Sequence, residues 1–151
     1  ASDVYKRQRF ENTGKHISPE LAEEICRLVD NHSSYVQQLS WLLWIRTINT
    51  ATTEQLSYAL EDLLDQNNIL FQSETENLSA YQMNFLKAIV DGIHTKFSSK
   101  EVISKYNLGT SANIVRLKNA LLQKELIETN GKEIVLADPV FGVWFKKEML
   151  Y

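Results

Sequence analysis

The sequence predicts a mainly α-helical protein built from two small modules, the second of which contains a β-hairpin. Apolar residues recur at intervals of three and four along most of the chain, which is the spacing of one helix face. An Asn-Gly pair near the C-terminus lies between two short apolar runs, which is typical of a hairpin turn. Of the 151 residues, 44% are hydrophobic and only 5 are glycine and 2 proline, a composition that excludes a collagen-like or disordered chain.

The division into two modules is indicated by charge. Residues 9–77 contain 4 basic and 11 acidic residues, a net charge of −7, whereas residues 78–151 contain 10 basic and 7 acidic residues, a net charge of +3. Such asymmetry is typical of modules with different partners. The polar segment 72–77 lies where the charge changes, and we expect it to connect the modules.

The first eight residues are expected to be foreign to the fold. Residues 3–8 read DVYKRQ, and the back-translation GAT GTG TAT AAG AGA CAG matches a transposon end used to prepare sequencing libraries. We therefore interpret residues 1–8 as adapter-derived, with a genuine polar N-terminus as the alternative. On this interpretation the natural protein extends upstream of Arg9, and this chain is the C-terminal part of a longer one.

The acidic module, residues 9–77, is expected to form three helices. Ser18-Pro19 begins the first, because serine caps the free N–H groups and proline fits the first turn. Ser33 or Ser34 is expected to cap the second helix, and Thr52 or Thr53 the third. The apolar faces of the three helices are Leu21, Ile25, Leu28 and Val29, then Val36, Leu39, Leu43 and Trp44, then Leu56, Leu60, Leu63 and Leu64.

The basic module, residues 78–151, begins with helices over 79–93 and from 98 to about 106. Ser98 and Glu101 have the spacing of a capping box at the start of the second helix. A tight turn follows at 107–110, where Gly109 can adopt a positive φ. A third helix runs to about residue 126, and Asn130-Gly131 then predicts a hairpin between residues 127–129 and 134–136. A last helix covers residues 139–149.

This order of helices, turn and hairpin resembles a winged helix-turn-helix. Residues 111–127 follow the usual pattern of its third helix leading into the wing, and residues 95–97 correspond to its short first strand. The sequence departs from the pattern at Glu125, where many such domains have glycine, so the chain must leave the helix without the freedom of glycine.

The resemblance implies that the third helix enters the major groove of double-stranded DNA. At 100° per residue, several polar side chains point away from the apolar face formed by Ile114, Leu117 and Leu121. Arginine can pair with guanine or phosphate, and asparagine can read adenine. The expected nucleic-acid-binding residues are Asn113, Arg116 and Asn119 on the helix and Lys132 at the tip of the wing.

Together the modules resemble the C-terminal region of a bacterial AAA+-type ATPase of the archaeal-type, origin-recognition-like group, in which a helical lid (here 9–77) precedes a winged helix (here 78–151). The segments that carry the resemblance are 10–18 (FENTGKHIS), 31–39 (NHSSYVQQL), 78–82 (LSAYQ) and 137–141 (ADPVF). In such relatives a Gly-x-Pro turn opens a lid helix near the nucleotide. In this sequence His32-Ser33-Ser34 occupies the position of that turn. The resemblance therefore implies nucleotide proximity for His32, Ser33, Ser34 and Tyr35, and an upstream core in the same chain that binds ATP and Mg²⁺.

No catalytic or metal site is expected within this chain. A phosphate-binding loop needs several glycines and a Ser or Thr for Mg²⁺, and Thr13-Gly14-Lys15-His16 lacks both an earlier glycine and a following hydroxyl. Cys26 is expected to be a buried small hydrophobic residue. We interpret Glu61, Asp62 and Asp65 as a solvated helix face, and Trp41, Trp44 and Trp144 as core anchors.

Two functions are compatible with these patterns. In the first, the lid and winged helix couple the nucleotide state of an ATPase to weak binding of DNA or a partner. In the second, the winged helix is a non-enzymatic protein-interaction or transcription-regulator module, and Leu122 packs on a partner or on the lid. A single cysteine suits a reducing cytoplasm, and the apolar run 39–48 is too short to span a bilayer, so no membrane partner is expected.

Overall fold

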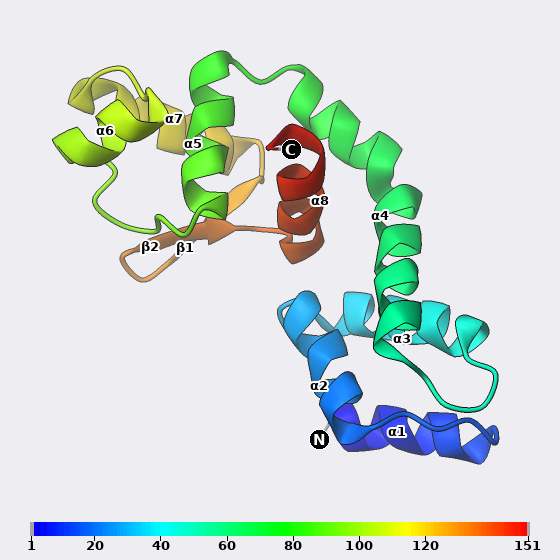
Figure 1. The fold of residues 1–151 in the computed structure, drawn as a ribbon. Coiled ribbons are helices and arrows are strands. Elements are labelled where there is room, and N and C mark those ends of the chain that lie inside the picture. Colours follow the sequence, from blue (N-terminus) through cyan, green and yellow to red (C-terminus); the bar gives the residue numbers. More distant parts are fainter. Residues whose placement is uncertain (1, 151) are drawn as a thin grey trace. The chain divides into compact units, whose positions relative to one another are not determined.

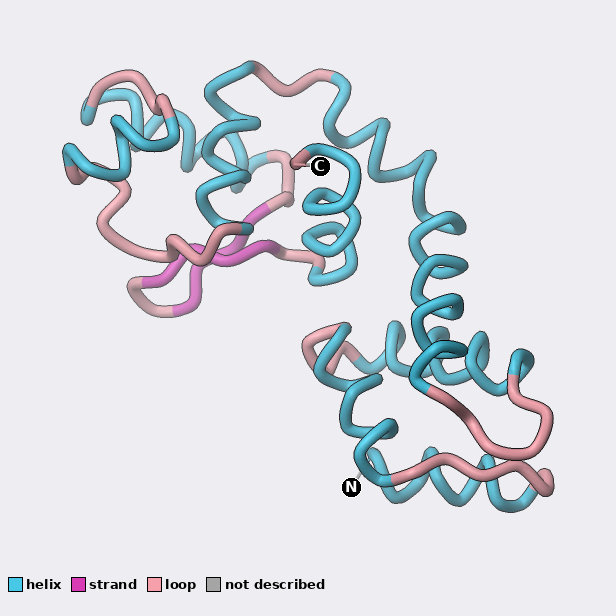
Figure 2. Tube along the Cα trace, viewed as in Figure 1, coloured by secondary structure: helices cyan, strands magenta, loops and turns pink. Residues whose placement is uncertain are grey.

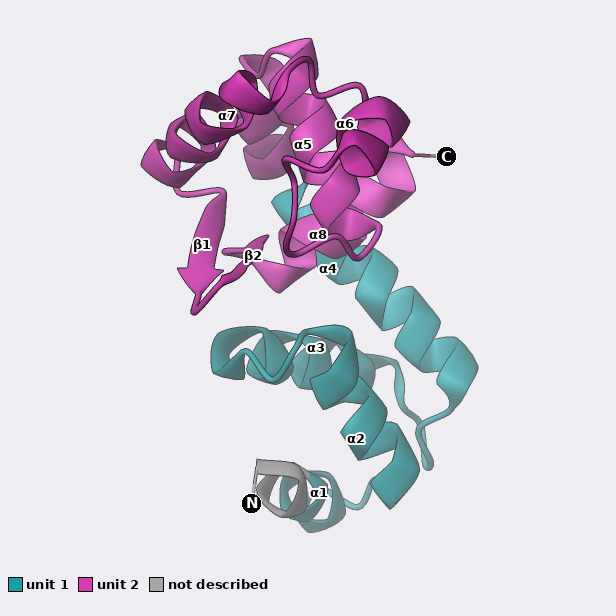
Figure 3. Ribbon diagram, turned by 90° about the vertical axis from the view of Figure 1, so that its left-hand side faces the viewer, with its two compact units in different colours: residues 1–68 teal, residues 69–151 magenta. Residues whose placement is uncertain are grey.

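The computed structural model describes the backbone of residues 2–150 and the side chains of residues 7–150 (Figure 1). It divides into two compact units, residues 1–68 and 69–151 (Figure 3). In the described part the elements are α1 (Ser2–Asn12), α2 (Pro19–Leu28), α3 (Ser33–Arg46), α4 (Thr53–Glu76), α5 (Ala80–Val90), α6 (Lys100–Tyr106), α7 (Ser111–Gln123), β1 (Ile127–Asn130), β2 (Glu133–Leu136) and α8 (Pro139–Met149). Helices and one antiparallel hairpin make up the chain (Figure 2), which confirms the predicted fold class.

The first unit contains the three predicted helices and an additional one, α1. α1 includes residues of the segment that we interpret as adapter-derived, and Phe10 near its end is 3% exposed. The origin of residues 1–8 stays a prediction, and the side chains of residues 1–6 lie outside the described part. After α1, the segment around His16 runs beside the segment before α4. The Ala51 N–H donates to the His16 carbonyl and the His16 N–H donates to the Asn49 carbonyl, each at 2.8 Å.

The predicted starts of α2 and α4 are confirmed. The Ser18 hydroxyl accepts a hydrogen bond from the Leu21 N–H at 3.1 Å. The Thr52 hydroxyl accepts from the Gln55 N–H at 3.1 Å, and the Gln55 side chain accepts in return from the Thr52 N–H at 3.0 Å. Each arrangement satisfies N–H groups that the first turn of a helix leaves without partners.

The predicted caps of α3 and α6 are each wrong by one position. The N-cap of α3 is His32, without a side-chain capping bond, and Ser33 is the first helical residue. The N-cap of α6 is Ser99, whose hydroxyl accepts from the Val102 N–H, in place of Ser98. At α6 the second of two adjacent serines is the cap, whereas at α3 the helix begins at the first serine and neither serine caps it.

Tryptophan burial differs among the three residues expected to be core anchors. Trp144 is 1% exposed, which confirms the expectation, and Trp44 is half-buried. Trp41 is 59% exposed, so its assignment to the core was wrong. It lies on the side of α3 that faces away from the buried residues Leu39 and Leu43. Cys26 is buried, as expected.

Helix α4 continues through the segment that was expected to connect the modules. Residues 72–76 are helical, so this part of the prediction was wrong, and the units divide at residues 68 and 69 within the helix. The reason is Phe71, which is fully buried in the second unit with ring centroids 5.5 Å from Phe141 and 5.6 Å from Trp144. One turn later, burial and the proximity of Asp138 raise the pKa of Glu74.

The second unit is built around α5, which packs against α6, α7, α8 and β2. Its core contains Phe85, Leu86, Leu121, Phe141 and Phe145, all at most 1% exposed. The Asp138 carboxylate caps α8 by accepting from the Val140 and Phe141 N–H groups at 2.9 and 3.1 Å. No helix of the described residues is both long and apolar enough to cross a membrane.

The end of α7 is a Schellman motif in which Glu125 occupies the position that usually holds glycine. The Leu126 N–H donates to the Leu121 carbonyl at 3.1 Å, and the Glu125 N–H donates to the Leu122 carbonyl at 3.0 Å. Glu125 has a φ of 59°, a left-handed conformation that is unfavourable for a residue with a Cβ atom. The departure noted in the sequence is therefore accommodated by strain at one residue, and the topology is unchanged.

We expect Glu125→Gly to stabilise the second unit by about 1 kcal/mol, because glycine adopts this conformation without the steric penalty. Native-state hydrogen exchange of the slowest amides in α5 and α7 measures this unit by itself. Lys124→Gly is the matched control, since Lys124 has a right-handed conformation with a φ of −78°. The control should lose about 0.5–1 kcal/mol. Equal effects of the two substitutions would exclude strain at Glu125.

Candidate nucleic-acid interface

Helix α7 is positioned by the turn at 107–110. Asn107 ends α6 in a left-handed conformation, with a φ of 53°, and Gly109 has a φ of 87° as predicted. Leu108 between them is fully buried and anchors the turn in the core. The chain can therefore reverse direction within a few residues, and α7 begins at Ser111.

The predicted apolar face of α7 is confirmed, since Ile114, Leu117 and Leu121 are at most 6% exposed. The opposite side of the helix is open to solvent and presents Arg116 and Asn119 as expected. Ala112 and Gln123 are exposed on the same helix.

Asn113 differs from the other three predicted binding residues. It is half-buried, and its side-chain amide donates to the Leu108 carbonyl at 3.1 Å. A Cβ atom added to Gly109 would lie 3.2 Å from this amide nitrogen, so glycine allows the close approach. The amide of Asn113 thus holds the turn in front of α7, and Arg116, Asn119 and Lys132 are the more accessible members of the set.

The wing is a short antiparallel hairpin in which Ile127 pairs with Leu136 and Asn130 pairs with Glu133. The two-residue turn is therefore Gly131-Lys132, one position later than the predicted Asn130-Gly131. Gly131 has a φ of 63°, which suits a turn with glycine at its first central position. Lys132 is exposed at the tip, as expected.

The base of the wing is attached to the loop after α5. The Ile134 N–H donates to the His94 carbonyl at 2.9 Å, and Nδ1 of His94 lies 3.0 Å from the Ile134 carbonyl oxygen. The predicted strand at residues 95–97 does not form. Lys96 within it has a φ of 58°, which interrupts extended backbone.

Two further residues at this surface were not predicted. Val115 is 64% exposed on α7 beside Arg116, and Tyr81 at the start of α5 is 44% exposed. Tyr81 lines a hollow of about 250 Å³ with residues from the amino end of α7, including Thr110 and Arg116. The position of Val115 in the sequence predicts that it lies off the buried face, but an exposed apolar residue does not by itself indicate a binding role.

The second unit matches a known family model over residues 69–147, just over half of the chain, and the model is described as a probable winged helix domain. The chain belongs to this family. The limits of the match agree with the start of the second unit at residue 69, so the winged helix domain includes the last turns of α4.

The solved structure of a Walker-type ATPase from Pyrococcus abyssi is similar to both units of the chain. The TM-score is 0.70 and the sequence identity is 19%, over 96% of this chain and 41% of that one. The likeness shows a shared fold, and the chain spans about two fifths of the length of that ATPase. Curated protein sequences give no significant match.

The winged helix carries little excess charge on its exposed elements. Residues 111–136 contain four basic residues and three acidic ones, a net charge of +1. Glu128 and Glu133 lie on the wing itself and are exposed. Electrostatic attraction to phosphate, which dominates non-specific DNA binding, is therefore weak at this surface.

The four residues expected near a nucleotide lie together at the amino end of α3 in the first unit. His32, Ser33 and Ser34 are exposed, and Tyr35 is half-buried with its ring centroid 4.9 Å from that of His32. The Ser34 hydroxyl accepts from the Gln38 side chain at 3.1 Å. Among the described residues no group of His, Cys, Asp and Glu side chains could hold a metal ion.

Proposed function

We propose that this chain is the lid and winged-helix region of an ATP-binding protein, and that its winged helix binds double-stranded DNA weakly through α7 and the wing. The observation that carries the DNA assignment is the exposure of Arg116 and Asn119 on the side of α7 opposite its buried face, with Lys132 exposed at the tip of the wing.

The chemistry of these side chains suits the base edges and the phosphates of DNA. Arg116 can donate two hydrogen bonds to a guanine edge or to a phosphate, and Asn119 can pair with an adenine edge. Lys132 can reach a flanking phosphate. Thr110, the N-cap of α7, makes no side-chain capping bond, and the first turn has no acidic residue. The amino end of α7 therefore favours a nearby phosphate.

The ATPase assignment is supported by the fold shared with a Walker-type ATPase and by the sequence segments that resemble a lid. In this proposal an upstream core binds ATP and Mg²⁺, and His32, Ser33, Ser34 and Tyr35 face the nucleotide. The lid would transmit the nucleotide state to the winged helix. This chain supplies the binding surface, and hydrolysis belongs to the core.

A titration of a fluorescently labelled duplex with the full chain tests the DNA assignment. We expect dissociation constants of about 10⁻⁴ to 10⁻⁶ M at physiological salt, with tighter binding as the salt concentration is lowered. A fragment of residues 69–151 has a net charge of +1, against −3 for the full chain, and should bind more tightly. Binding that is absent at low salt, or insensitive to salt, would argue against contact with phosphates.

A second candidate function is protein binding, and the exposure of Val115 and Tyr81 favours it. Leu122, which was expected to pack on a partner, is half-buried, so Val115 is the more accessible apolar residue. If the duplex titration fails, Val115→Asp should disrupt a complex between the winged helix and its partner. If the titration succeeds, Val115 can contact a thymine methyl group.

A further inference from the structure

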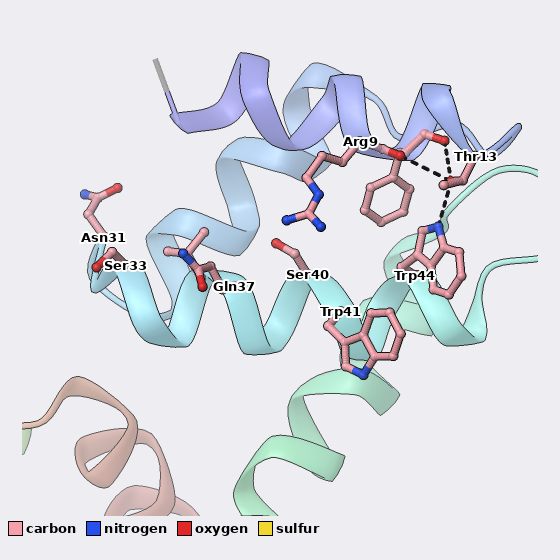
Figure 4. A pocket seen from close by; sticks show the side chains of 10 residues that line it. Arg9, Thr13, Asn31, Ser33, Gln37, Ser40, Trp41 and Trp44 are labelled. Carbon is pink, nitrogen blue, oxygen red and sulfur yellow. Dashed lines mark hydrogen bonds between the residues drawn. The ribbon is translucent and has the colours of Figure 1, made fainter.

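A pocket of about 500 Å³ opens between α1 and α3 in the first unit (Figure 4). Phe10, Val36, Trp41 and Trp44 supply its apolar wall. Its volume falls within the range of about 300–1,000 Å³ that is typical of small-molecule sites. No residue of the proposed DNA surface lines the pocket, whereas Ser33, which the proposed function places near the nucleotide, lies at one end of it.

The aromatic part of the wall is held in place by several contacts. The indole N–H of Trp44 donates to the Thr13 hydroxyl at 2.8 Å. The Lys15 ammonium lies 3.9 Å from the centroid of the Trp44 ring and donates to the Trp44 carbonyl at 2.7 Å. Trp41 stacks on Trp44 with centroids 5.2 Å apart and planes inclined by 14°. Because Trp41 is still 59% exposed, a planar ring can stack on this preorganised pair.

Ser40 contributes a polar group that lacks a partner. Its side chain is 9% exposed, and its hydroxyl makes no hydrogen bond within the described structure. Serine inside a helix often donates to the carbonyl four residues earlier, and Ser40 does not. In Figure 4 the hydroxyl points into the space between α1 and α3, on the side of Arg9. A ligand that accepts a hydrogen bond here relieves the unfavourable burial of the hydroxyl.

The described lining of the pocket contains one charged side chain, which is basic. Among the described residues that line it, Arg9 alone carries a charge, and its guanidinium extends into the pocket (Figure 4). Asn31 and Ser33 line the end of the pocket at the start of α3, whose first turn has no acidic residue. The amino end of this helix adds positive potential.

We propose that this pocket binds a planar aromatic carboxylic acid. The ring stacks on Trp41, and the carboxylate faces the Arg9 guanidinium, whose planar fork matches a carboxylate in a two-bond geometry. The Ser40 hydroxyl donates to the same carboxylate. This assignment uses the aromatic wall, the positive charge and the unpartnered hydroxyl together, and it depends on none of the winged-helix residues.

Calorimetric titration of the full chain with 2-naphthoate and with the neutral 2-naphthylmethanol tests the proposal. We expect saturable binding of the acid, and binding of the alcohol that is weaker by about tenfold or more. Arg9→Gln should abolish this preference, whereas Arg27→Gln on α2 removes the same charge outside the pocket and should preserve it. If a variant fails to fold, the comparison of the acid and the alcohol on the wild-type chain still tests the proposal.

Ser40→Ala separates a binding role from a structural one. It should weaken 2-naphthoate binding several-fold and raise the melting temperature of the ligand-free chain, because a buried hydroxyl without a partner is removed. If Ser40 had a role in the fold alone, its replacement would not lower the affinity for 2-naphthoate while raising the melting temperature. The proposal is overturned if 2-naphthoate does not saturate at millimolar concentrations, if the alcohol binds equally well, or if Ser40→Ala leaves binding unchanged.

Discussion

Phe71→Ala is expected to destabilise the winged helix domain by about 3–5 kcal/mol, the range for truncating a buried phenylalanine. Phe71 is fully buried, and its ring meets Phe141 edge-on, with centroids 5.5 Å apart and planes at 82°. Its ring centroid is also 5.6 Å from that of Trp144. Truncation removes both aromatic contacts and leaves a cavity among residues that are themselves at most 1% exposed.

The loss of stability can be measured in the full chain by urea unfolding that is monitored through hydrogen exchange of the α5 and α8 amides. Ile69→Ala is the matched control on the same helix, because Ile69 is 83% exposed. It should change the stability by no more than about 0.5 kcal/mol.

A fragment that begins at residue 69 retains Phe71 and should be folded, whereas one that begins at residue 78 lacks it and should be unstable. Equal stability of the two fragments would contradict this account of the domain boundary.

Arg116→Ala is expected to weaken duplex binding by about 1–3 kcal/mol if the guanidinium reads a base, and by less if it contacts phosphate only. Arg116 is exposed on the middle of α7 and lines the hollow beside Tyr81, so its removal leaves the buried face of the helix intact. Anisotropy titrations at two salt concentrations measure both the affinity and its salt dependence.

Arg116→Lys distinguishes the two modes of contact. Lysine keeps the charge but lacks the planar fork, so it restores a phosphate contact and not a two-bond contact to guanine. If the lysine variant binds as the wild type does, Arg116 contacts phosphate. If it binds as the alanine variant does, Arg116 reads a base. Unchanged binding in Arg116→Ala would favour the protein-binding function.

Helical periodicity predicted most helices of both units, because α2, α3, α5, α7 and α8 each bury apolar residues that recur at three and four positions. The faces of α2, α3 and α7 follow directly from the spacing of Leu21 and Ile25, of Leu39 and Leu43, and of Leu117 and Leu121. Caps were less predictable. Ser98 and Ser99 offer the same chemistry at neighbouring positions, and α3 begins at Ser33 without a side-chain cap, so the packed structure decides where each helix starts.

The end of α4 could not be predicted from local pattern. Residues 72–76 are all polar, and a polar stretch at a change of charge is typical of a connection. It is helical because Phe71 and Thr75, one turn apart, are both buried in the second unit. Phe71 contacts Phe141 and Trp144, which lie far along the chain, and no local pattern describes such contacts.

The candidate DNA surface was predicted in part. Counting around α7 identified the exposed Arg116 and Asn119, but not the hydrogen bond of Asn113 to the turn, which depends on the position of the Leu108 carbonyl. The hairpin register differs from prediction because pairing Ile127 with Leu136 centres the turn on Gly131 and Lys132. The pocket between α1 and α3 was not predicted, because Trp41 was assigned to the core.

The most direct test of DNA binding through α7 and the wing is a low-salt anisotropy titration of two charge-matched double variants. Arg116→Ala with Lys132→Ala removes two charges from the proposed surface, whereas Lys146→Ala with Lys147→Ala removes two from α8, which packs on α5 and β2. The first variant should bind at least about tenfold more weakly than wild type, and the second within about twofold of it. Equal losses in the two variants, or no loss in the first, would contradict the account.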